Sequence, residues 1–221
     1  MSAAMIVLGI VGTPASGKST VAAHLQSKGA AWINADLIAR DVLHQQAVTD
    51  KLAEHFGSDI LGDDGTIQRS KLAALVFGKS AQQQAALDYL ESVIHPPTRI
   101  EITRQLQAAA KSGAQVALLD VPLLFESAWD RSCDAIWCID APREMRLKWS
   151  ENRGWDAAEL DRREVNQTAI AEKRRLSNVI LDNDATLSDL LKIVDSQWQI
   201  LVTMGSIGPD DSAPPHCLTD N

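Results

Sequence analysis

The residues with the clearest chemical purpose form a glycine-rich segment near the start of the chain, Gly12-Thr13-Pro14-Ala15-Ser16-Gly17-Lys18-Ser19-Thr20. Its spacing is G-x-x-x-x-G-K-[ST], the pattern of a phosphate-binding loop. Gly12 and Gly17 allow backbone angles and close approaches that a side chain would block, so successive N–H groups can surround phosphate oxygens. Lys18 can place a positive charge on the β- and γ-phosphates, and the Ser19 hydroxyl can hold Mg²⁺. The segment predicts binding of ATP or GTP and leaves the reaction open.

The neighbouring sequence predicts the strand–loop–helix order that this loop needs. Residues 5–11 form a short apolar run typical of a buried strand, and the run leads directly into the loop. Apolar residues then recur at helical spacing as far as Leu25, and Gly29 stands where a helix would end. A helix that begins near Lys18 would direct its unpaired N–H groups and the positive end of its dipole at the phosphates.

Two aspartates follow predicted strands and are candidates to face the loop. Asp36 follows a short strand at 30–33, and Asp120 ends the apolar run 115–120. In open α/β sheets, ligands lie outside the carboxyl ends of the strands. Asp120 resembles the carboxylate that holds Mg²⁺ in a Walker B strand, although many buried strands end in Asp for reasons of turn formation. Asp36 is equally placed to cap the helix 37–43, and the two roles are compatible.

The rest of the chain completes an α/β pattern. Further strands are predicted at 135–140 and 178–183, separated from the first strands by a mostly helical block over 44–113. Within that block, a helix is expected to break at His95-Pro96-Pro97. Residues 143–176 are densely charged, which is typical of a solvated helix pair. The alternative is a lid whose arginines close over the γ-phosphate.

Composition narrows the class of protein. The 221 residues suffice for one α/β domain with insertions, and a formal net charge of −8 does not favour a nucleic-acid partner. The three cysteines show no C-x-x-C spacing, so neither a disulfide framework nor a zinc site is expected. No signal peptide and no membrane-spanning segment are recognisable. We therefore expect a cytoplasmic protein without membrane or nucleic-acid partners, and the oligomeric state is left open.

Taken together, these segments resemble one family closely, the dephospho-coenzyme A kinases. The most distinctive matches are residues 35–40, which read A-D-L-I-A-R, and residues 120–126, which read D-V-P-L-L-F-E. The resemblance runs in unbroken order from about residue 5 to residue 201. The other matching positions are Gly17-Lys18-Ser19-Thr20, Phe56-Gly57, Asp64-Gly65, Arg69, His95-Pro96, Arg153, Arg163, Gln167, Glu172-Lys173-Arg174, Val179-Ile180 and Asp182-Asn183.

The resemblance implies a P-loop kinase fold of the α/β class, with a parallel five-stranded sheet flanked by helices. It implies one kinase domain over 5–205 and a flexible tail over 206–221. Within the domain, the nucleotide-binding core would comprise about 5–35, 114–142 and 177–205, the helical substrate-binding insert 36–113, and the lid 143–176.

It also implies the reaction, which is ATP-dependent phosphorylation of the ribose 3′-hydroxyl of dephospho-CoA, the last step of CoA synthesis, with Mg²⁺ as cofactor. Asp36 would accept the hydroxyl proton or orient the hydroxyl, and Lys18 and Arg153 would neutralise the transferring group. The implied ATP-binding residues are Gly12, Ala15, Ser16, Gly17, Lys18, Ser19, Thr20, Arg153 and Arg163. The implied substrate-binding residues are Asp36, Arg40, His95, Pro122, Leu123 and Glu126, and the implied metal ligands are Ser19 and Asp120.

The chain departs from the family pattern at three places. Asn34 stands where the family usually has Asp, so that only Asp36 can be the base of that pair. Trp149 stands where the family usually has a second lid arginine, and Arg146 or Lys148 is the candidate replacement. The segment between Arg153 and Gln167 is one residue short of the family pattern.

Two other functions fit the phosphate loop. One is another small-molecule or nucleoside monophosphate kinase of the same fold. The other is a nucleotide-binding regulator that transfers no phosphate. A GTPase is not expected, because the guanine-reading pattern N-K-x-D is absent from the sequence.

Overall fold

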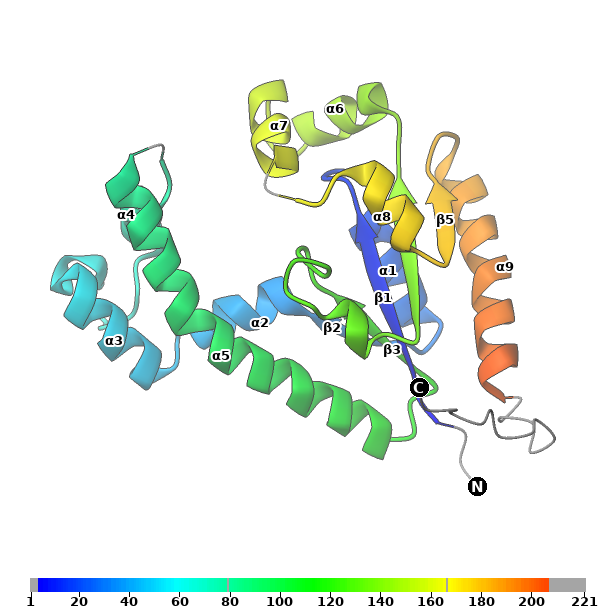
Figure 1. Ribbon diagram of the computed structural model, residues 1–221, viewed down its shortest axis with the longest axis horizontal. Helices are drawn as coiled ribbons and strands as arrows, with labels where there is room; N and C mark the ends of the chain where they lie inside the picture. The colour runs from blue at the N-terminus through cyan, green and yellow to red at the C-terminus, as the bar shows by residue number, and fades with distance from the viewer. Residues whose placement is uncertain (1–3, 79, 166, 207–221) are drawn as a thin grey trace, which may run out of the picture.

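The computed structural model describes residues 4–78, 80–165 and 167–206 (Figure 1). At its centre lies a parallel sheet with the strand order β2-β3-β1-β4-β5. The predicted α/β fold with a parallel five-stranded sheet is confirmed. The strands are β1 (Ile6–Gly12), β2 (Ala31–Asn34), β3 (Val116–Asp120), β4 (Ala135–Asp140) and β5 (Val179–Asp182).

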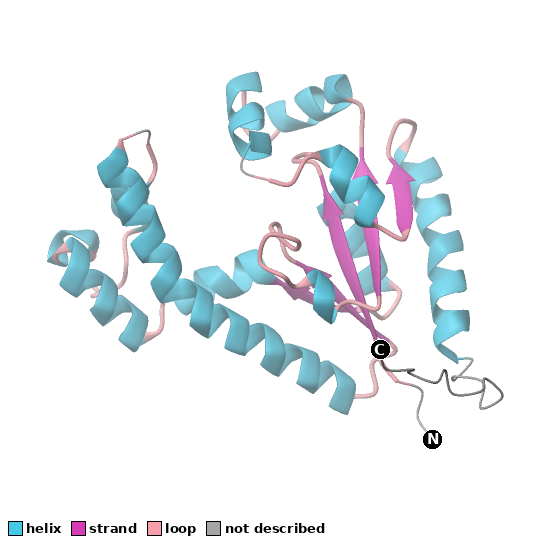
Figure 2. Cartoon of the chain, viewed as in Figure 1, coloured by secondary structure: helices cyan, strands magenta, loops and turns pink. Residues whose placement is uncertain are grey.

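Helices cover both faces of this sheet, as Figure 2 shows. Helices α1 (Lys18–Ser27) and α9 (Leu187–Ser206) contact each other on one face, and α8 (Ile170–Leu176) contacts β1 and β4. Successive strand side chains point to opposite faces, so Leu118 belongs to the core cluster beneath α1 and α9 while Leu119 belongs to the other cluster. Burial of both faces explains why the strands are continuously apolar.

A helical insert leaves the sheet after β2 and returns at β3. It consists of α2 (Ala35–Val42), α3 (Gln46–Phe56), a short 3-10 turn at Ser58–Ile60, α4 (Arg69–Val76) and α5 (Ala81–Lys111). Figure 1 shows this insert projecting to one side of the sheet.

The predicted helix break at His95-Pro96-Pro97 is wrong, because α5 runs through Pro96 and Pro97 without interruption. A proline inside a helix costs about 3 kcal/mol in lost hydrogen bonding and steric clash. Here α5 packs against α2, α3, α4 and the strands β2 and β3, with Leu90 and Ile102 buried on either side of the prolines. These tertiary contacts on both sides hold the helix together.

The densely charged segment forms three helices in the described chain, α6 (Arg143–Glu151), α7 (Ala157–Val165) and α8. Figure 1 shows α6 and α7 beyond the carboxyl ends of β1 and β4. Helix α9 continues to Ser206, and the rest of the predicted tail lies outside the described residues. Among the helices described here, none has both the length and the apolar character to cross a bilayer.

Candidate active site

The phosphate-binding loop connects β1 to α1 with an unusual backbone. Ala15 has φ +63° and Gly17 has φ +97°, the left-handed geometry that occurs in backbone nests for anions. A Cβ atom on Gly12 would lie 2.2 Å from the carbonyl oxygen of Ile139, so only glycine fits there. At Gly17 a Cβ atom would lie 2.7 Å from Nδ2 of Asn183.

Side chains from the far end of the chain hold this loop from behind. Lys173 on α8 donates from Nζ to the Gly12 carbonyl at 3.0 Å, and Asn183 donates from Nδ2 to the Ser16 carbonyl at 2.9 Å. Burial lowers the pKa of Lys173, although the charge of Glu126 opposes that shift. The Ser16 hydroxyl is buried without a hydrogen-bond partner among the described residues, so its neighbours constrain it by packing alone.

The end of β3 gathers polar groups from three elements. Asp120 is only 3% exposed, and its Oδ1 forms an ion pair with Nζ of Lys18 at the start of α1. Its Oδ2 accepts from Nε1 of Trp32 at 3.3 Å and from Nδ2 of Asn34 at 3.5 Å. The loop lysine and the predicted metal ligand are therefore in contact.

Asp36 lies in the first turn of α2 and is not its cap. Asn34 caps this helix by accepting from the Leu37 N–H at 3.1 Å, so the predicted capping role of Asp36 is wrong. The Asp36 side chain is open to solvent, yet the surrounding protein removes enough water to raise the pKa of its carboxyl. Lys18 opposes this shift most strongly, Asp120 adds to it, and Arg40 and Arg163 lower the pKa. Charges on the loop, on its own helix and on α7 thus all act on the pKa of Asp36.

The two predicted lid arginines both lie close to the ring of one tryptophan, Trp155. The guanidinium carbon of Arg163 is 4.0 Å from the ring centroid of Trp155, and that of Arg153 is 5.4 Å from it. Arg163 also donates from Nε to Glu159 at 2.8 Å. Both arginine side chains are exposed.

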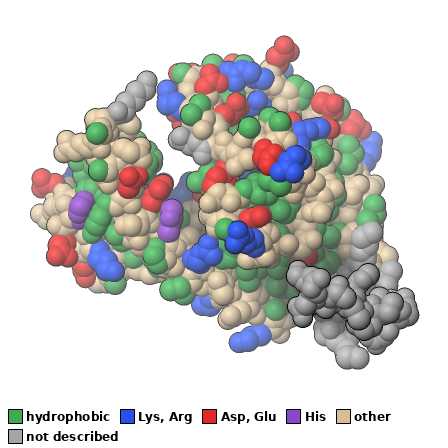
Figure 3. Space-filling model, viewed as in Figure 1, with side chains coloured by type: hydrophobic (Ala, Val, Ile, Leu, Met, Phe, Trp, Pro, Cys, Tyr) green, Lys and Arg blue, Asp and Glu red, His purple; other side chains and the backbone are tan. Residues whose placement is uncertain are grey.

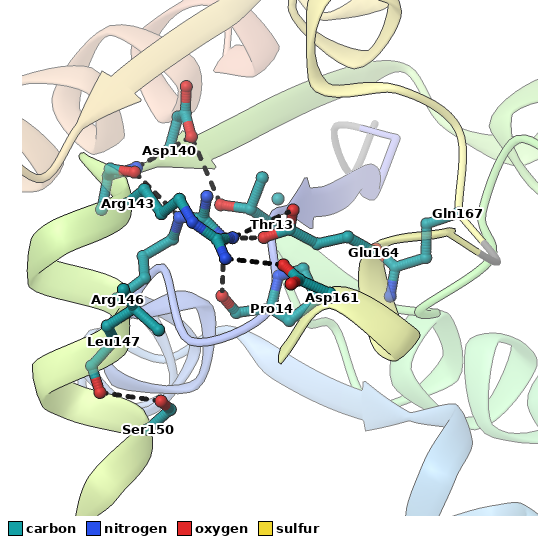
Figure 4. A network of polar contacts seen from close by, with 12 residues as sticks. Thr13, Pro14, Asp140, Arg143, Arg146, Leu147, Ser150, Asp161, Glu164 and Gln167 are labelled. Atoms are coloured by element: carbon teal, nitrogen blue, oxygen red, sulfur yellow. Dashed lines mark hydrogen bonds and ion pairs between the residues drawn. The ribbon is translucent and has the colours of Figure 1, made fainter. Parts of the chain in front are cut away.

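A separate network joins α6 to α7 and to the loop (Figure 4). Arg146 is buried, forms an ion pair with Glu164 on α7, and donates from Nη1 to the Pro14 carbonyl at 3.5 Å. Arg143 pairs with Asp161 at 2.7 Å. These contacts hold the two helices together over the phosphate loop.

A cavity of about 380 Å³ opens beside the loop, between α6 and the region from β5 to α9. Its wall is mixed in character, with the Trp149 indole and the Arg153 guanidinium both contributed by α6 and the segment after it. The lining residues are Ala15, Gly17, Thr20, Met145, Trp149, Arg153, Asn183, Ala185, Leu187 and Leu190. On the other side of the loop, the space-filling view shows an indentation between the insert and α7 (Figure 3).

Some residues named from the sequence lie apart from this group. His95 is exposed on α5, and no hydrogen bond or ion pair with a described residue connects it to Asp36 or Arg40. Pro122 and Leu123 lie in the turn after β3. Glu126 accepts from the backbone N–H of Thr168 at 2.5 Å and from its hydroxyl at 2.8 Å, which makes it an anchor for the segment before α8. Ser19 is exposed at the start of α1.

A family model described as dephospho-CoA kinase matches residues 6–189 of this sequence. The chain belongs to the dephospho-CoA kinase family. The predicted resemblance is confirmed, and with it the prediction of an ATP-dependent kinase that acts on dephospho-CoA.

Relatives and a solved structure support the same assignment. A dephospho-CoA kinase of Rhodopirellula baltica is 38% identical over 191 residues, covering 86% of this chain and 88% of the relative. One of Corynebacterium glutamicum is 38% identical over 188 residues, covering 84% and 92%. A crystal structure from Thermus thermophilus is 31% identical and superposes with a TM-score of 0.74, covering 90% and 98%. The fold is also that of a dephospho-CoA kinase from Campylobacter jejuni, with a TM-score of 0.63 and 23% identity over 88% and 96%.

The positions at which the chain departs from the family pattern have definite places in the structure. Asn34 both caps α2 and donates to Asp120, so the Asp36 carboxylate is not used as the helix cap. Trp149 lines the cavity beside the loop. Arg146, one of its candidate replacements, is already engaged by Glu164 and Pro14, whereas Lys148 is exposed.

Sequence reasoning assigned no role to Lys173, Trp155 or Glu164. The resemblance matches Lys173 only as part of Glu172-Lys173-Arg174. Composition alone does not separate the buried Lys173 from the half-buried Arg174 and the exposed Arg175. Lys173 lies on the face of α8 that meets the sheet, so its burial could be inferred only once the packing of α8 on β4 is known.

Proposed function

We propose that this protein transfers the γ-phosphoryl group of ATP to the ribose 3′-hydroxyl of dephospho-CoA, giving CoA. The observation that carries the proposal is the position of Asp36 in the first turn of α2, directly after β2. In the β2–β3 register the last residue of β2, Asn34, lies opposite Asp120, which forms the ion pair with Lys18 of the loop. The Asp36 carboxylate, close to the loop lysine but free of the helix cap, is where an acceptor hydroxyl needs a base.

ATP would place its phosphates in the loop and its base in the cavity beside the loop. The N–H groups around Ala15 and Gly17 and the start of α1 suit phosphate oxygens. The Trp149 indole offers a flat apolar surface on which a purine base can stack. Because Lys18 pairs with Asp120 in this structure, the phosphates would compete with Asp120 for its ammonium group.

Asp36 would orient the 3′-hydroxyl and accept its proton as the new P–O bond forms. Phosphoryl transfer requires mainly positioning and charge neutralisation from the protein. A pKa raised by partial burial makes the carboxylate a stronger base than an aspartate in water. Arg40, one turn further along α2, adds a positive charge beside the same cleft.

Ser19 and Asp120 would hold Mg²⁺ together with the phosphates. A hydroxyl and a carboxylate are hard oxygen donors, and Mg²⁺ is commonly bound by one or two such groups plus substrate phosphates. Bound there, Mg²⁺ would neutralise charge on the β- and γ-phosphates. Asp120 becomes available as Lys18 turns to the phosphates.

The lid would consist of α6 and α7, with Arg153 and Arg163 as its cations. Arg153 lines the cavity next to the loop, and Arg163 lowers the pKa of Asp36. Closure of the lid would exclude water, which otherwise would accept the phosphoryl group. His95 and the segment 122–126 are proposed to contact the acceptor on the insert side.

The deciding experiment incubates the protein with ATP, Mg²⁺ and dephospho-CoA and identifies the product by mass and by ³¹P NMR. We expect a product one phosphoryl group heavier, with the new phosphate on the ribose 3′-oxygen. The Lys18→Ala variant, purified in the same way, is the control for contaminating kinases. Adenosine monophosphate, adenosine and a sugar acid serve as competing acceptors.

Two outcomes would contradict the proposal. Preferential transfer to adenosine monophosphate or the sugar acid would favour another small-molecule kinase. Intact ATP binding without transfer to any acceptor would favour a nucleotide-binding regulator.

A further inference from the structure

The ring of Trp155 lies close to both arginines that the proposed lid would use. Its ring centroid is 4.0 Å from the guanidinium carbon of Arg163 and 5.4 Å from that of Arg153. Arg163 influences the carboxyl of Asp36, on the acceptor side, while Arg153 lines the cavity on the nucleotide side. One indole is therefore close to a cation on the nucleotide side and to a cation on the acceptor side.

We propose that Trp155 is a positioning residue that holds Arg153 and Arg163 at a fixed separation, so that both cations reach the transferring phosphoryl group together. This inference rests on the proposed function. Trp155 itself touches neither substrate and acts through the two arginines.

The physical need for such a residue follows from the exposure of both arginines. An exposed arginine samples many rotamers, and fixing one costs up to about 2 kcal/mol in side-chain entropy. Arg153 forms no ion pair with any described residue, so its contact with the indole is its main restraint. Two guanidinium groups also repel each other, and a ring with electron-rich faces lets both approach one site.

The turn between α6 and α7 directs the indole to this place. Ser150 is fully buried, its carbonyl accepts from the N–H groups of Arg153 at 2.9 Å and Trp155 at 3.1 Å, and its hydroxyl donates to the Leu147 carbonyl at 2.8 Å. Gly154 has φ +70°, which places Trp155 back over α7. The turn is thus specified by residues other than the tryptophan.

The two helices do not depend on the indole to stay together. Arg146 pairs with Glu164, and Arg143 pairs with Asp161, on the side of α6 that faces α7 (Figure 4). Leu160 on α7 is fully buried. Replacement of Trp155 is therefore expected to release the arginines while α6 and α7 remain joined.

Arg162 provides a matched control. It is the neighbour of Arg163 and pairs with the same Glu159, at 2.7 Å, but it does not stack on Trp155. Its removal changes the net charge of α7 as much as removal of Arg163 does.

The test is a double-mutant cycle on kcat with ATP and dephospho-CoA. Trp155→Leu is expected to lower kcat on the order of tenfold, equal to about 1.4 kcal/mol, with less than about a twofold change in either KM. Trp155→Phe, which keeps a ring face, should recover most of the loss. In the Arg162→Ala background Trp155→Leu should cost the same tenfold, whereas in the Arg153→Ala/Arg163→Ala background it should cost almost nothing.

An equal loss in the Arg153→Ala/Arg163→Ala background would overturn the inference, because Trp155 would then act through the fold. Thermal melting of each variant confirms that it is folded. If Trp155→Leu does not melt cooperatively, the wild-type protein still gives an answer. Its Arg153 and Arg163 Nε–H NMR signals should both show an upfield ring-current shift, and absence of either shift contradicts the inference. Inactivity of the wild-type protein would refute the proposed function instead.

Discussion

The side chains that hold the phosphate loop and the arginines on α7 differ in how far they are exposed to solvent. Behind the loop, Lys173 is 2% exposed and Asn183 is 7% exposed, and both donate to loop carbonyls. On α7, the side chains of Arg162 and Arg163 are 62% and 47% exposed and pair with a single glutamate. The loop is held by buried side chains, whereas Arg162 and Arg163 of α7 lie on the protein surface.

This difference in exposure suits the loop to binding phosphate and suits α6–α7 to opening and closing over it. Buried groups held by hydrogen bonds open only with large parts of the structure, so the loop is ready for phosphate before a nucleotide arrives. Exposed ion pairs are worth at most about 1 kcal/mol, so the arginines can move at small cost. Substitutions in the loop should therefore abolish function, and those in α6–α7 should reduce it.

The largest effect is expected at Lys18. Lys18→Ala removes the cation of the loop and leaves the buried Asp120 without its ion-pair partner. We expect kcat/KM to fall on the order of a thousandfold, the scale found when a main electrostatic contact to the transition state is lost. Steady-state kinetics with varied ATP measures it, and a loss below about tenfold would contradict the role of the loop.

Asp36→Asn is expected to have the next largest effect. It removes the proton acceptor but keeps the shape of the side chain, so kcat should fall on the order of a hundredfold. ATP affinity, measured by calorimetry, should stay near normal because Asn34 rather than Asp36 caps α2. Full activity of this variant would refute the assigned base.

The pH dependence sharpens the same prediction. The Asp36 carboxyl must be ionised to accept a proton, and partial burial raises its pKa above the ordinary 3.8 despite Lys18, Arg40 and Arg163. Activity is thus full above the raised pKa and is lost as the pH falls through it. The acid limb of kcat/KM should lie at higher pH than for a free aspartate and disappear in Asp36→Asn.

A pair of glycine substitutions compares the two regions by stability. Gly12→Ala puts a methyl group 2.2 Å from a backbone carbonyl, so it should lower the free energy of unfolding by about 3 kcal/mol. At Gly154 an added Cβ atom would meet no atom within 4 Å, but φ is +70°. Gly154→Ala should therefore lower the free energy of unfolding by about 1 kcal/mol. Urea unfolding measures both. Equal losses would mean that the loop is no more constrained than the turn.

The smallest effect is expected at Trp149, on the edge of the nucleotide cavity. Loss of one stacking surface costs about 1–3 kcal/mol, so Trp149→Ala should raise the KM for ATP about tenfold and leave kcat nearly unchanged. Trp149→Phe is the matched control. An unchanged KM would place the base elsewhere.

Local patterns predicted the sheet well, because each strand is a continuous apolar run and the loop has a fixed spacing. They predicted a break in α5, since the effect of Pro96 and Pro97 is local while the contacts that hold the helix come from α2 and α4. The site was predictable only where a fixed local spacing assigns a residue its role, as the phosphate loop does for Lys18. The ion pair of Arg146 with Glu164 and the stacking on Trp155 depend on how α6 and α7 are placed in space.

The most direct test of the account is a crystal structure with a non-hydrolysable ATP analogue, Mg²⁺ and dephospho-CoA. The account predicts the triphosphate in the loop and the ribose 3′-oxygen at hydrogen-bond distance, about 2.6–3.2 Å, from the Asp36 carboxylate. A 3′-oxygen bound away from Asp36, or an Asp36 side chain turned out of the cleft, would contradict it.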